Sequence, residues 1–221
     1  MQWFYFLAIH RLAIGVALLI QYLAPLLVAL WARFAVGEAV RRRVWLALGL
    51  ALAGLALLVQ VVGGGAHLST AGIVFALGGA VTYALYVLLA ERALGERDPI
   101  SLLGFGFLAA TVFWAVVSPW WTFPGGVVAA SPSLGGHVAS WHLPVWALAA
   151  WMVVLGTIVP FFLLVSALRH LSATRVGIVA MLEPVAGSLV AWVWLAESLD
   201  GVQLAGAAVV LAAIVLAQTA R

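Results

Sequence analysis

Glu183 and Pro184 stand side by side in an apolar run, VAMLEPVAGSLVAW at 179–192, where Glu183 is the only charged residue. A charge at the centre of a membrane helix costs about 2.5–3.5 kcal/mol, so it normally faces the protein interior or a wet cavity. Pro184 has no N–H and leaves the carbonyl of Ala180 without its helical partner. A carboxylate beside a free carbonyl suits an ammonium group or a proton, which predicts substrate binding or proton coupling. A protonated glutamate bonded to a neighbouring helix explains the pattern equally well.

Four further polar residues are candidates for substrate binding, and two of them, Gln21 and Tyr22, form a weaker mirror image of the Glu183 site in the other repeated segment. Gln21 and Tyr22 precede Pro25 by one helical turn, and the amide of Gln21 can both donate and accept hydrogen bonds. Tyr83 and Tyr86 share one turn of another apolar segment and could line a cavity. Hydrogen bonding between helices is the competing interpretation for Gln21, and packing is the competing interpretation for the tyrosine pair.

The residue types that most enzymes require are absent or badly placed. The chain has no cysteine and no lysine, which excludes thiolate metal sites, a P-loop lysine and a lysine Schiff base such as retinal forms. Ser188 lacks the Gly-x-Ser-x-Gly setting of a nucleophile. His137 and His142 lie in a loop without a carboxylate, which is a weak metal signal. We therefore expect no enzyme activity, no cofactor, no metal and no nucleic-acid partner.

The composition requires a lipid environment. Of the 221 residues, 67% are hydrophobic and 8% are charged, against about 25% charged in soluble domains. Apolar runs of this length form helices in lipid, because the backbone must satisfy its own hydrogen bonds. The sequence thus predicts an all-α, polytopic helical bundle with an N-terminal stub at 1–9 and about seven membrane spans. The expected spans are 13–34, 44–62, 70–91, 100–120, 145–167, 174–195 and 201–219.

The arginines predict the orientation, since cytoplasmic loops carry an excess of positive residues. With seven spans, only Arg11 falls on one side of the membrane, together with Glu197 and Asp200. The other nine arginines fall on the opposite side: Arg33, Arg41, Arg42, Arg43, Arg92, Arg97, Arg169, Arg175 and Arg221. We therefore expect a multi-pass inner-membrane protein with a cytoplasmic C-terminus. The long loop at about 121–143 would face outward.

An internal repeat appears when the sequence is shifted by 159 residues. The segment AIHRLAIGVALLIQYLAPLLVALWARFAVGE at 8–38 aligns without gaps with ALRHLSATRVGIVAMLEPVAGSLVAWVWLAE at 167–197. Pro25 meets Pro184, and Glu38 meets Glu197. Equivalent spans lie five helices apart, so the two copies cross the membrane in opposite directions, as in many secondary transporters. We expect residues 1–62 to be the incomplete end of a first repeat and 63–221 to be a second repeat, in a chain shortened at its N-terminus.

The repeated segments resemble the EamA-type transporters of the drug/metabolite transporter superfamily. The resemblance rests on LSATRVGIVAMLEPVAGSLVAWVWLAESLDGVQLAGAAVVLAAIVL near the C-terminus and on RLAIGVALLIQYLAPLLVALWARFAVGE near the N-terminus. It implies a ten-helix inner-membrane carrier of small metabolites, commonly an exporter, and the LEP and QYLAP segments look most like the amino-acid efflux branch. The chain departs from the family pattern by lacking its first two helices and most of the third, and by Ala196 in place of a glycine.

Together these patterns predict an exporter of amino acids or related compounds that works by alternating access. Its expected site residues are Glu183, Pro184, Gln21, Pro25, Tyr83 and Tyr86. Its expected partners are a small-molecule substrate and membrane lipid, with a homodimer as an option. The alternative is a truncated, non-transporting paralogue or a partner subunit of a membrane complex.

Overall fold

The computed structural model describes residues 1–60, 69–196 and 198–219, and the regular secondary structure of this part consists of helices, without a β-strand. Among the described residues, six segments are long and apolar enough to cross a membrane. They are Ile14–Val36, Thr70–Ala93, Pro99–Val117, Val145–Ala167, Ala173–Leu195 and Gly201–Gln218. The prediction of an all-α, polytopic membrane protein is therefore confirmed.

The expected span that is missing from these six is 44–62, which corresponds to α4, Arg42–Leu58, a helix of 17 residues. Its expected last residues, 61–62, lie outside the described part of the chain. A helix of this length is at the short end of the range that crosses hydrocarbon, about 17–25 residues. The count of seven spans is thus not confirmed. The N-terminal stub forms a short helix, α1, Gln2–Ile9.

The described helices group into two compact units. The first unit holds α1, α2 (Ile14–Gln21), α3 (Ala24–Trp31), α4, most of α5 (Thr70–Ala93), α9 (Ala173–Ala180), the first part of α10 (Leu182–Leu195) and α11 (Gly201–Gln218). The second unit holds α6 (Pro99–Val117), α7 (Val145–Val153), α8 (Val159–Ala167) and the end of α10. The units follow contacts rather than sequence repeats, so the expected division into 1–62 and 63–221 stays a prediction.

Helix boundaries recur at the offset of 159 residues. Adding 159 to the bounds of α2, Ile14–Gln21, gives those of α9, Ala173–Ala180. The candidate span Ile14–Val36 maps in the same way onto Ala173–Leu195. The first residue of α4 maps onto the first residue of α11. The two segments therefore share both their sequence pattern and their helix breaks, while Glu197, the expected partner of Glu38, lies outside the described residues.

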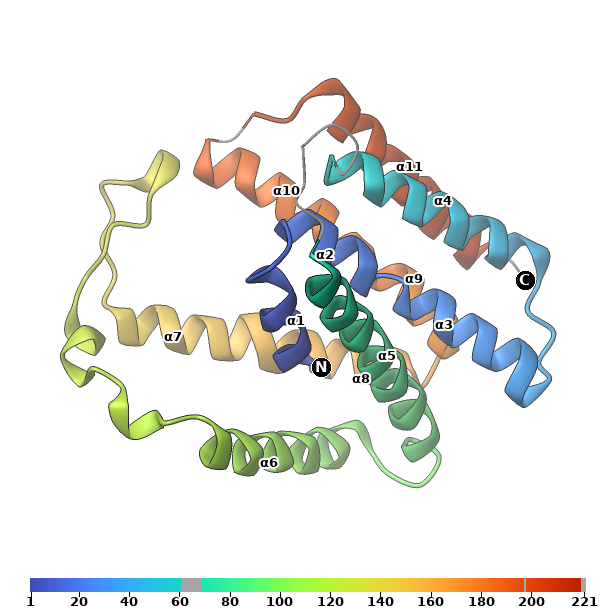
Figure 1. The fold of residues 1–221 in the computed structure, drawn as a ribbon, viewed down its shortest axis with the longest axis horizontal. Helices are drawn as coiled ribbons and strands as arrows, with labels where there is room; N and C mark the ends of the chain where they lie inside the picture. The colour runs from blue at the N-terminus through green and yellow to red at the C-terminus, as the bar shows by residue number, and fades with distance from the viewer. Residues whose placement is uncertain (61–68, 197, 220–221) are drawn as a thin grey trace. The chain divides into compact units, whose positions relative to one another are not determined.

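Helices α4 and α11 pack side by side in the first unit (Figure 1). A Cβ atom added to Gly54 would lie 2.8 Å from the carbonyl oxygen of Gly206, so the two backbones touch where neither residue has a side chain. Gly54 lies near the end of α4 and Gly206 near the start of α11, which makes the two helices antiparallel. Small residues at such a crossing permit the close approach on which helix association in lipid depends. Gln60 adds a hydrogen bond to Asp200, the N-cap residue of α11.

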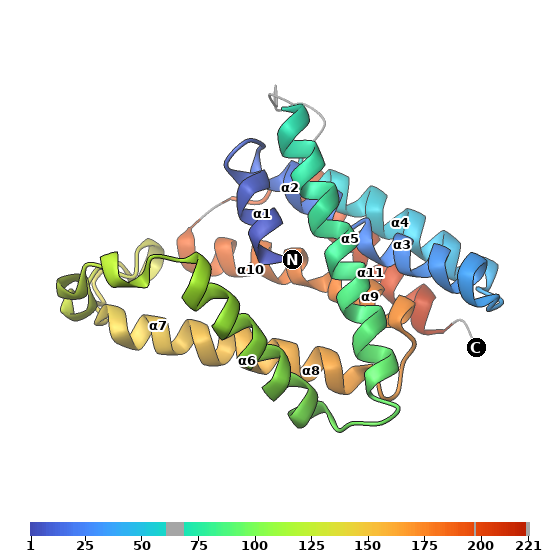
Figure 2. The same ribbon diagram turned by 60° about the horizontal axis from the view of Figure 1, so that its bottom comes forward.

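In the second unit, α7 continues through a π-helical turn at Val154–Ile158 into α8, and the three segments form one long rod (Figure 2). Phe107 of α6 meets Phe161 of α8 edge to face, with ring centroids 6.1 Å apart. Many large apolar side chains of these helices remain exposed, as expected for surfaces that face lipid tails.

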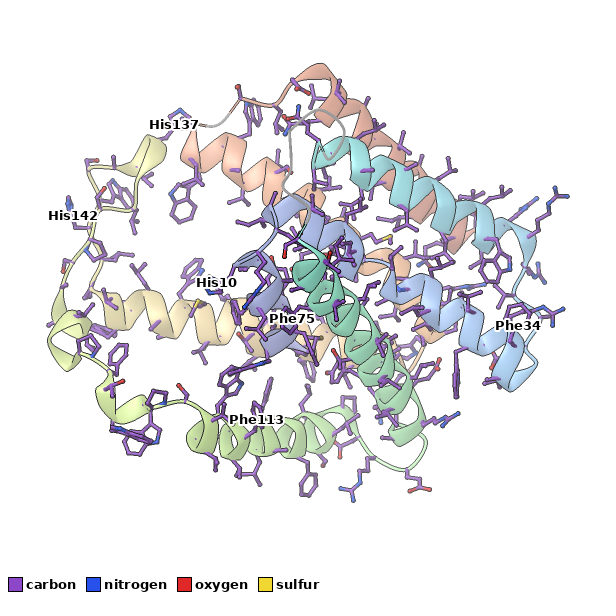
Figure 3. All side chains as sticks on the ribbon, in the orientation of Figure 1. His10, Phe34, Phe75, Phe113, His137 and His142 are labelled. Carbon is purple, nitrogen blue, oxygen red and sulfur yellow. The ribbon has the colours of Figure 1, made fainter. Side chains whose placement is uncertain are left out.

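The segment between α6 and α7 contains short 3₁₀ turns and an isolated antiparallel bridge between Ser133 and His142, and it carries His137 as well (Figure 3). The ring of His137 bonds the carbonyl of Val193 through Nδ1 at 2.8 Å. The indole of Trp194 donates to the carbonyl of Leu134 at 3.1 Å. These two bonds fasten the segment to the end of α10 within the second unit.

Candidate functional site

Two helix breaks lie at the centres of two candidate spans. Pro25 is the twelfth of the 23 residues in Ile14–Val36, and Pro184 is the twelfth of the 23 residues in Ala173–Leu195. Helix α2 ends at Gln21 before Pro25, and α9 ends at Ala180 before Pro184. Gln21 and Ala180 each lie four positions before a proline. Because proline has no N–H, the backbone carbonyls of Gln21 and Ala180 lack the hydrogen bond that a helix would otherwise give them. The expected interruptions at mid-span are therefore present in both segments.

The Glu183 carboxylate meets Tyr22, which lies in the break between α2 and α3. The Tyr22 hydroxyl donates a hydrogen bond to Oε2 of Glu183 at 2.9 Å. Tyr22 is buried, with 5% of its surface exposed, whereas the side chain of Glu183 is exposed. Among the described residues the carboxylate makes no other hydrogen bond and no ion pair. A carboxylate can accept about four hydrogen bonds, so most of its capacity stays open to a ligand.

All four tyrosines of the chain lie in the first unit, and three of them surround Glu183. Besides Tyr22, both Tyr5 of α1 and Tyr83 of α5 lie within electrostatic range of the carboxylate. Tyr86 lies beside Tyr83, one turn further along α5. Helices α1, α5 and α10 and the break after α2 thus bring phenol groups around one acid.

Gln21 approaches the same part of α5. A Cβ atom added to Gly79 would lie 3.6 Å from Oε1 of Gln21, and Gly79 precedes Tyr83 by one turn. Oε1 of Gln21 is buried and has no hydrogen-bond partner among the described residues. The hydroxyl of Thr82 is instead used by its own helix, since it donates to the carbonyl of Gly78 at 2.8 Å. Gln21 therefore brings an unused acceptor to the tyrosine-bearing face of α5.

Pro25 has a packing role as well as a backbone role. It is buried against α9, where a Cβ atom added to Gly177 would lie 2.9 Å from Cβ of Pro25. Pro184 is partly buried, and its carbonyl accepts a hydrogen bond from the Ser188 hydroxyl at 2.9 Å. Of the six expected site residues, Tyr83 of α5 lies near Glu183 of α10, and Tyr86 lies next to Tyr83. Gln21 points toward α5, the helix that carries both tyrosines. The two prolines shape the breaks.

Tyr5 was not predicted from the sequence, and Tyr22 was expected only as the neighbour of Gln21. Both lie in apolar stretches where a tyrosine is compatible with packing. One signal was available in the sequence: every tyrosine of the chain falls within an apolar segment, whereas tryptophan also gathers around the outer loop.

The chemistry of this site is that of a carboxylic acid bonded to one phenol, Tyr22, with the phenols of Tyr5 and Tyr83 nearby. Glu183 can bind a cation or exchange a proton, and tyrosine rings add their negative faces to the attraction of an ammonium group. No group of three histidine, cysteine, aspartate or glutamate side chains within 1–60, 69–196 and 198–219 is placed to hold a metal ion.

The sequence matches the model of the EamA-like transporter family over residues 1–60 and 70–219. The threonine/homoserine exporter RhtA of Salmonella typhimurium is 28% identical over 216 residues, which cover 96% of this chain and 65% of that protein. An uncharacterized transporter of Archaeoglobus fulgidus is 29% identical over 217 residues, which cover 96% of this chain and 70% of that protein. The chain thus spans 65% of the length of the exporter.

A solved crystal structure has the same helical fold. It matches with a TM-score of 0.74 and 21% sequence identity, over 99% of this chain and 73% of that chain. At this identity the likeness concerns the fold alone.

Proposed function

Because the chain belongs to the EamA-like transporter family, we propose that it carries small metabolites across the inner membrane and exports amino acids or related compounds. Membership agrees with the resemblance seen in the sequence and with the expectation that the chain is not an enzyme. The name of the Salmonella relative, a threonine/homoserine exporter, supports this class of substrate.

One observation carries the proposal: an exposed carboxylate at the centre of a broken span, held through one oxygen by the Tyr22 hydroxyl. An acid at this depth costs free energy unless it has a function or a partner. One bond from Tyr22 fixes the position of Glu183 and leaves the rest of the carboxylate for a ligand. The substrate ammonium, or a proton exchanged with it, would occupy that side.

The other expected residues complete the proposed site. Tyr83 and Tyr86 would offer ring faces and hydroxyls to the substrate, and Gln21 would offer its unused amide oxygen. The breaks at Pro25 and Pro184 would supply free carbonyls. Alternating access would follow from rocking of one repeat against the other, with the C-terminus on the cytoplasmic side.

The test replaces Glu183 by glutamine, which keeps the shape of the side chain and removes its charge. Efflux of labelled threonine and homoserine is measured at several external pH values in cells that lack their own exporters and express this chain. Loss of a hydrogen bond to a charged group costs about 1.5–3 kcal/mol, so we expect efflux to fall by about tenfold or more. We also expect its pH dependence to flatten. Glu96→Gln is the matched control, because Glu96 is exposed in the turn after α5.

Efflux and pH dependence equal to wild type in Glu183→Gln would refute the role of Glu183. If wild type itself folds but gives no efflux, the alternative of a non-transporting partner subunit is favoured.

A further inference from the structure

A small gap lies between α5, α1 and the end of α2 in the first unit, at the place where Gly79 has no side chain. A Cβ atom added to Gly79 would lie 3.6 Å from Oε1 of Gln21. The same atom would lie 3.9 Å from Cβ of Phe4 and 3.9 Å from the backbone nitrogen of Tyr5. These are ordinary contact distances, so the gap can hold a further atom beside Gln21 without displacing a neighbour.

The polar atom at this gap is Oε1 of Gln21. It is buried and has no hydrogen-bond partner within 1–60, 69–196 and 198–219. A buried acceptor without a partner is costly, and such atoms in folded proteins normally meet a protein group, a water or a ligand. An amide oxygen only accepts hydrogen bonds, so the missing partner must be a donor. The gap therefore suits a hydroxyl or an N–H group.

Each of the three elements around the gap also carries a tyrosine that lies near Glu183. In the break after α2 this is Tyr22, whose hydroxyl donates to Oε2 of Glu183 at 2.9 Å. In α5 it is Tyr83, one turn after the glycine, and in α1 it is Tyr5, at the gap itself. The unpaired amide oxygen and the carboxylate thus belong to one neighbourhood.

The repeat shows that the break in α2 does not itself require an amide. At the offset of 159 residues, Gln21 corresponds to Ala180. Both residues end a helix four positions before a proline, and alanine is sufficient at the second break. The Gln21 side chain is therefore not needed to end the helix, which favours a role toward a ligand.

We propose that Gln21 determines the specificity of the site: its Oε1 accepts a hydrogen bond from the side chain of the substrate while Glu183 holds the substrate ammonium. The inference rests on the proposed function, because it concerns another part of the same substrate. The favoured ligand is an amino acid with a small side chain that carries a hydroxyl or another donor. A site that bonds a substrate hydroxyl rejects the analogue that lacks it.

The test compares threonine with valine, which has a methyl group in place of the hydroxyl. The purified full chain in an uncharged maltoside detergent is titrated with each amino acid, and its thermal unfolding midpoint is followed by tryptophan fluorescence. Stabilisation that saturates with ligand reports the dissociation constant. We expect threonine to bind about tenfold more tightly than valine, since it gives the buried oxygen a partner.

Three variants separate this role from a structural one. Gln21→Met keeps the length of the side chain and removes the acceptor, so threonine should bind about tenfold more weakly while valine binding stays unchanged. Gly79→Ala fills the gap and should weaken both ligands, without lowering the midpoint of the ligand-free protein, because its contacts are ordinary. Gln218→Met is the matched control: Nε2 of Gln218 is also buried without a partner in the described part of the chain, but it lies at the end of α11.

A threonine preference that is lost in Gln21→Met and kept in Gln218→Met supports the inference. Equal weakening of threonine and valine in Gln21→Met would overturn it, because the residue would then only support the fold. Threonine and valine binding alike in wild type, and both lost in Glu183→Gln, would overturn the role of Gln21 and leave the proposed function standing. Stabilisation by neither would overturn it together with amino-acid binding at Glu183, which the efflux assay tests separately.

Discussion

The packing of α4 against α11 predicts opposite effects for the same substitution at two glycines of one helix. Gly49 and Gly54 both lie in α4, and neither has a positive φ. A Cβ atom added to Gly49 meets nothing within 4 Å, whereas one added to Gly54 meets the Gly206 carbonyl oxygen at 2.8 Å and the Val210 nitrogen at 2.9 Å. Alanine at Gly49 therefore tests only the effect of helix propensity on stability, and alanine at Gly54 tests the effect of close packing as well.

The magnitude follows from the two distances. Alanine in a helix interior is more stable than glycine by about 0.5–1 kcal/mol, so Gly49→Ala should stabilise by that amount. At Gly54 the ordinary contact distance begins at 3.4 Å, so the backbones must part by about 0.6 Å from 2.8 Å. Overpacking of a core costs about 1–3 kcal/mol, which exceeds the propensity gain. We expect the two variants to differ by about 2 kcal/mol.

The assay is thermal unfolding in detergent, followed by tryptophan fluorescence and by elution of the remaining folded protein on a sizing column. For chains of this length about 1 kcal/mol shifts the midpoint by about 2–4 °C, so the two midpoints should differ by about 4–8 °C. The double variant Gly54→Ala/Gly206→Ala should lose less than the sum of its single variants, because one separation of the helices relieves both clashes. Equal midpoints for Gly49→Ala and Gly54→Ala would refute the close contact between α4 and α11.

Two further predictions concern the second unit. Hydrogen bonds from the Ser101 hydroxyl and backbone hold the pKa of Asp98, the N-cap residue of α6, below its ordinary value of 3.8, so its stabilising effect is complete above that value and is lost as the pH falls through the lowered pKa. The protection of the first turn of α6 against hydrogen exchange, measured relative to the intrinsic exchange rate at each pH, should therefore fall in acid in wild type but not in Asp98→Asn. An equal fall in both proteins would contradict this cap. Trp194→Phe removes the hydrogen bond to the Leu134 carbonyl and should speed hydrogen exchange across 133–139. Trp146→Phe is the matched control, because the Trp146 indole is exposed, and it should leave this exchange unchanged. Equal exchange in the two variants would show that the bond does not hold the segment.

The sequence predicted the features that depend on order along the chain. Apolar runs predicted the helices, because hydrocarbon forces the backbone to satisfy itself. The two matched prolines predicted breaks at mid-span, and both breaks occur, since a proline removes a helical donor wherever it stands. The acid before Pro184 identified the candidate site for the same local reason.

The partner of that acid could not be predicted, because it depends on which helices become neighbours. Tyr22 precedes Glu183 by 161 residues. Helical periodicity places a residue on a face of its own helix, but many pairings of such apolar helices bury similar areas. The helices that actually pair approach closely at glycines such as Gly177 and Gly54. A side chain at either glycine would collide with the neighbouring helix. The sequence alone does not show which helix such a glycine will contact.

The repeat also explains why the proposed site contains a single acid. At the offset of 159 residues, Tyr22 corresponds to Met181 and Glu183 corresponds to Ala24, so the fold offers a second place for the same pair. That place holds methionine and alanine, both fully or almost fully buried, with 0% and 1% of their surfaces exposed. A second acid there would place two like charges within one unit in a medium that screens little, which raises the cost of ionising either one. A repeated backbone with one polar pair and one apolar pair therefore keeps the geometry of both breaks while confining the charge to a single copy.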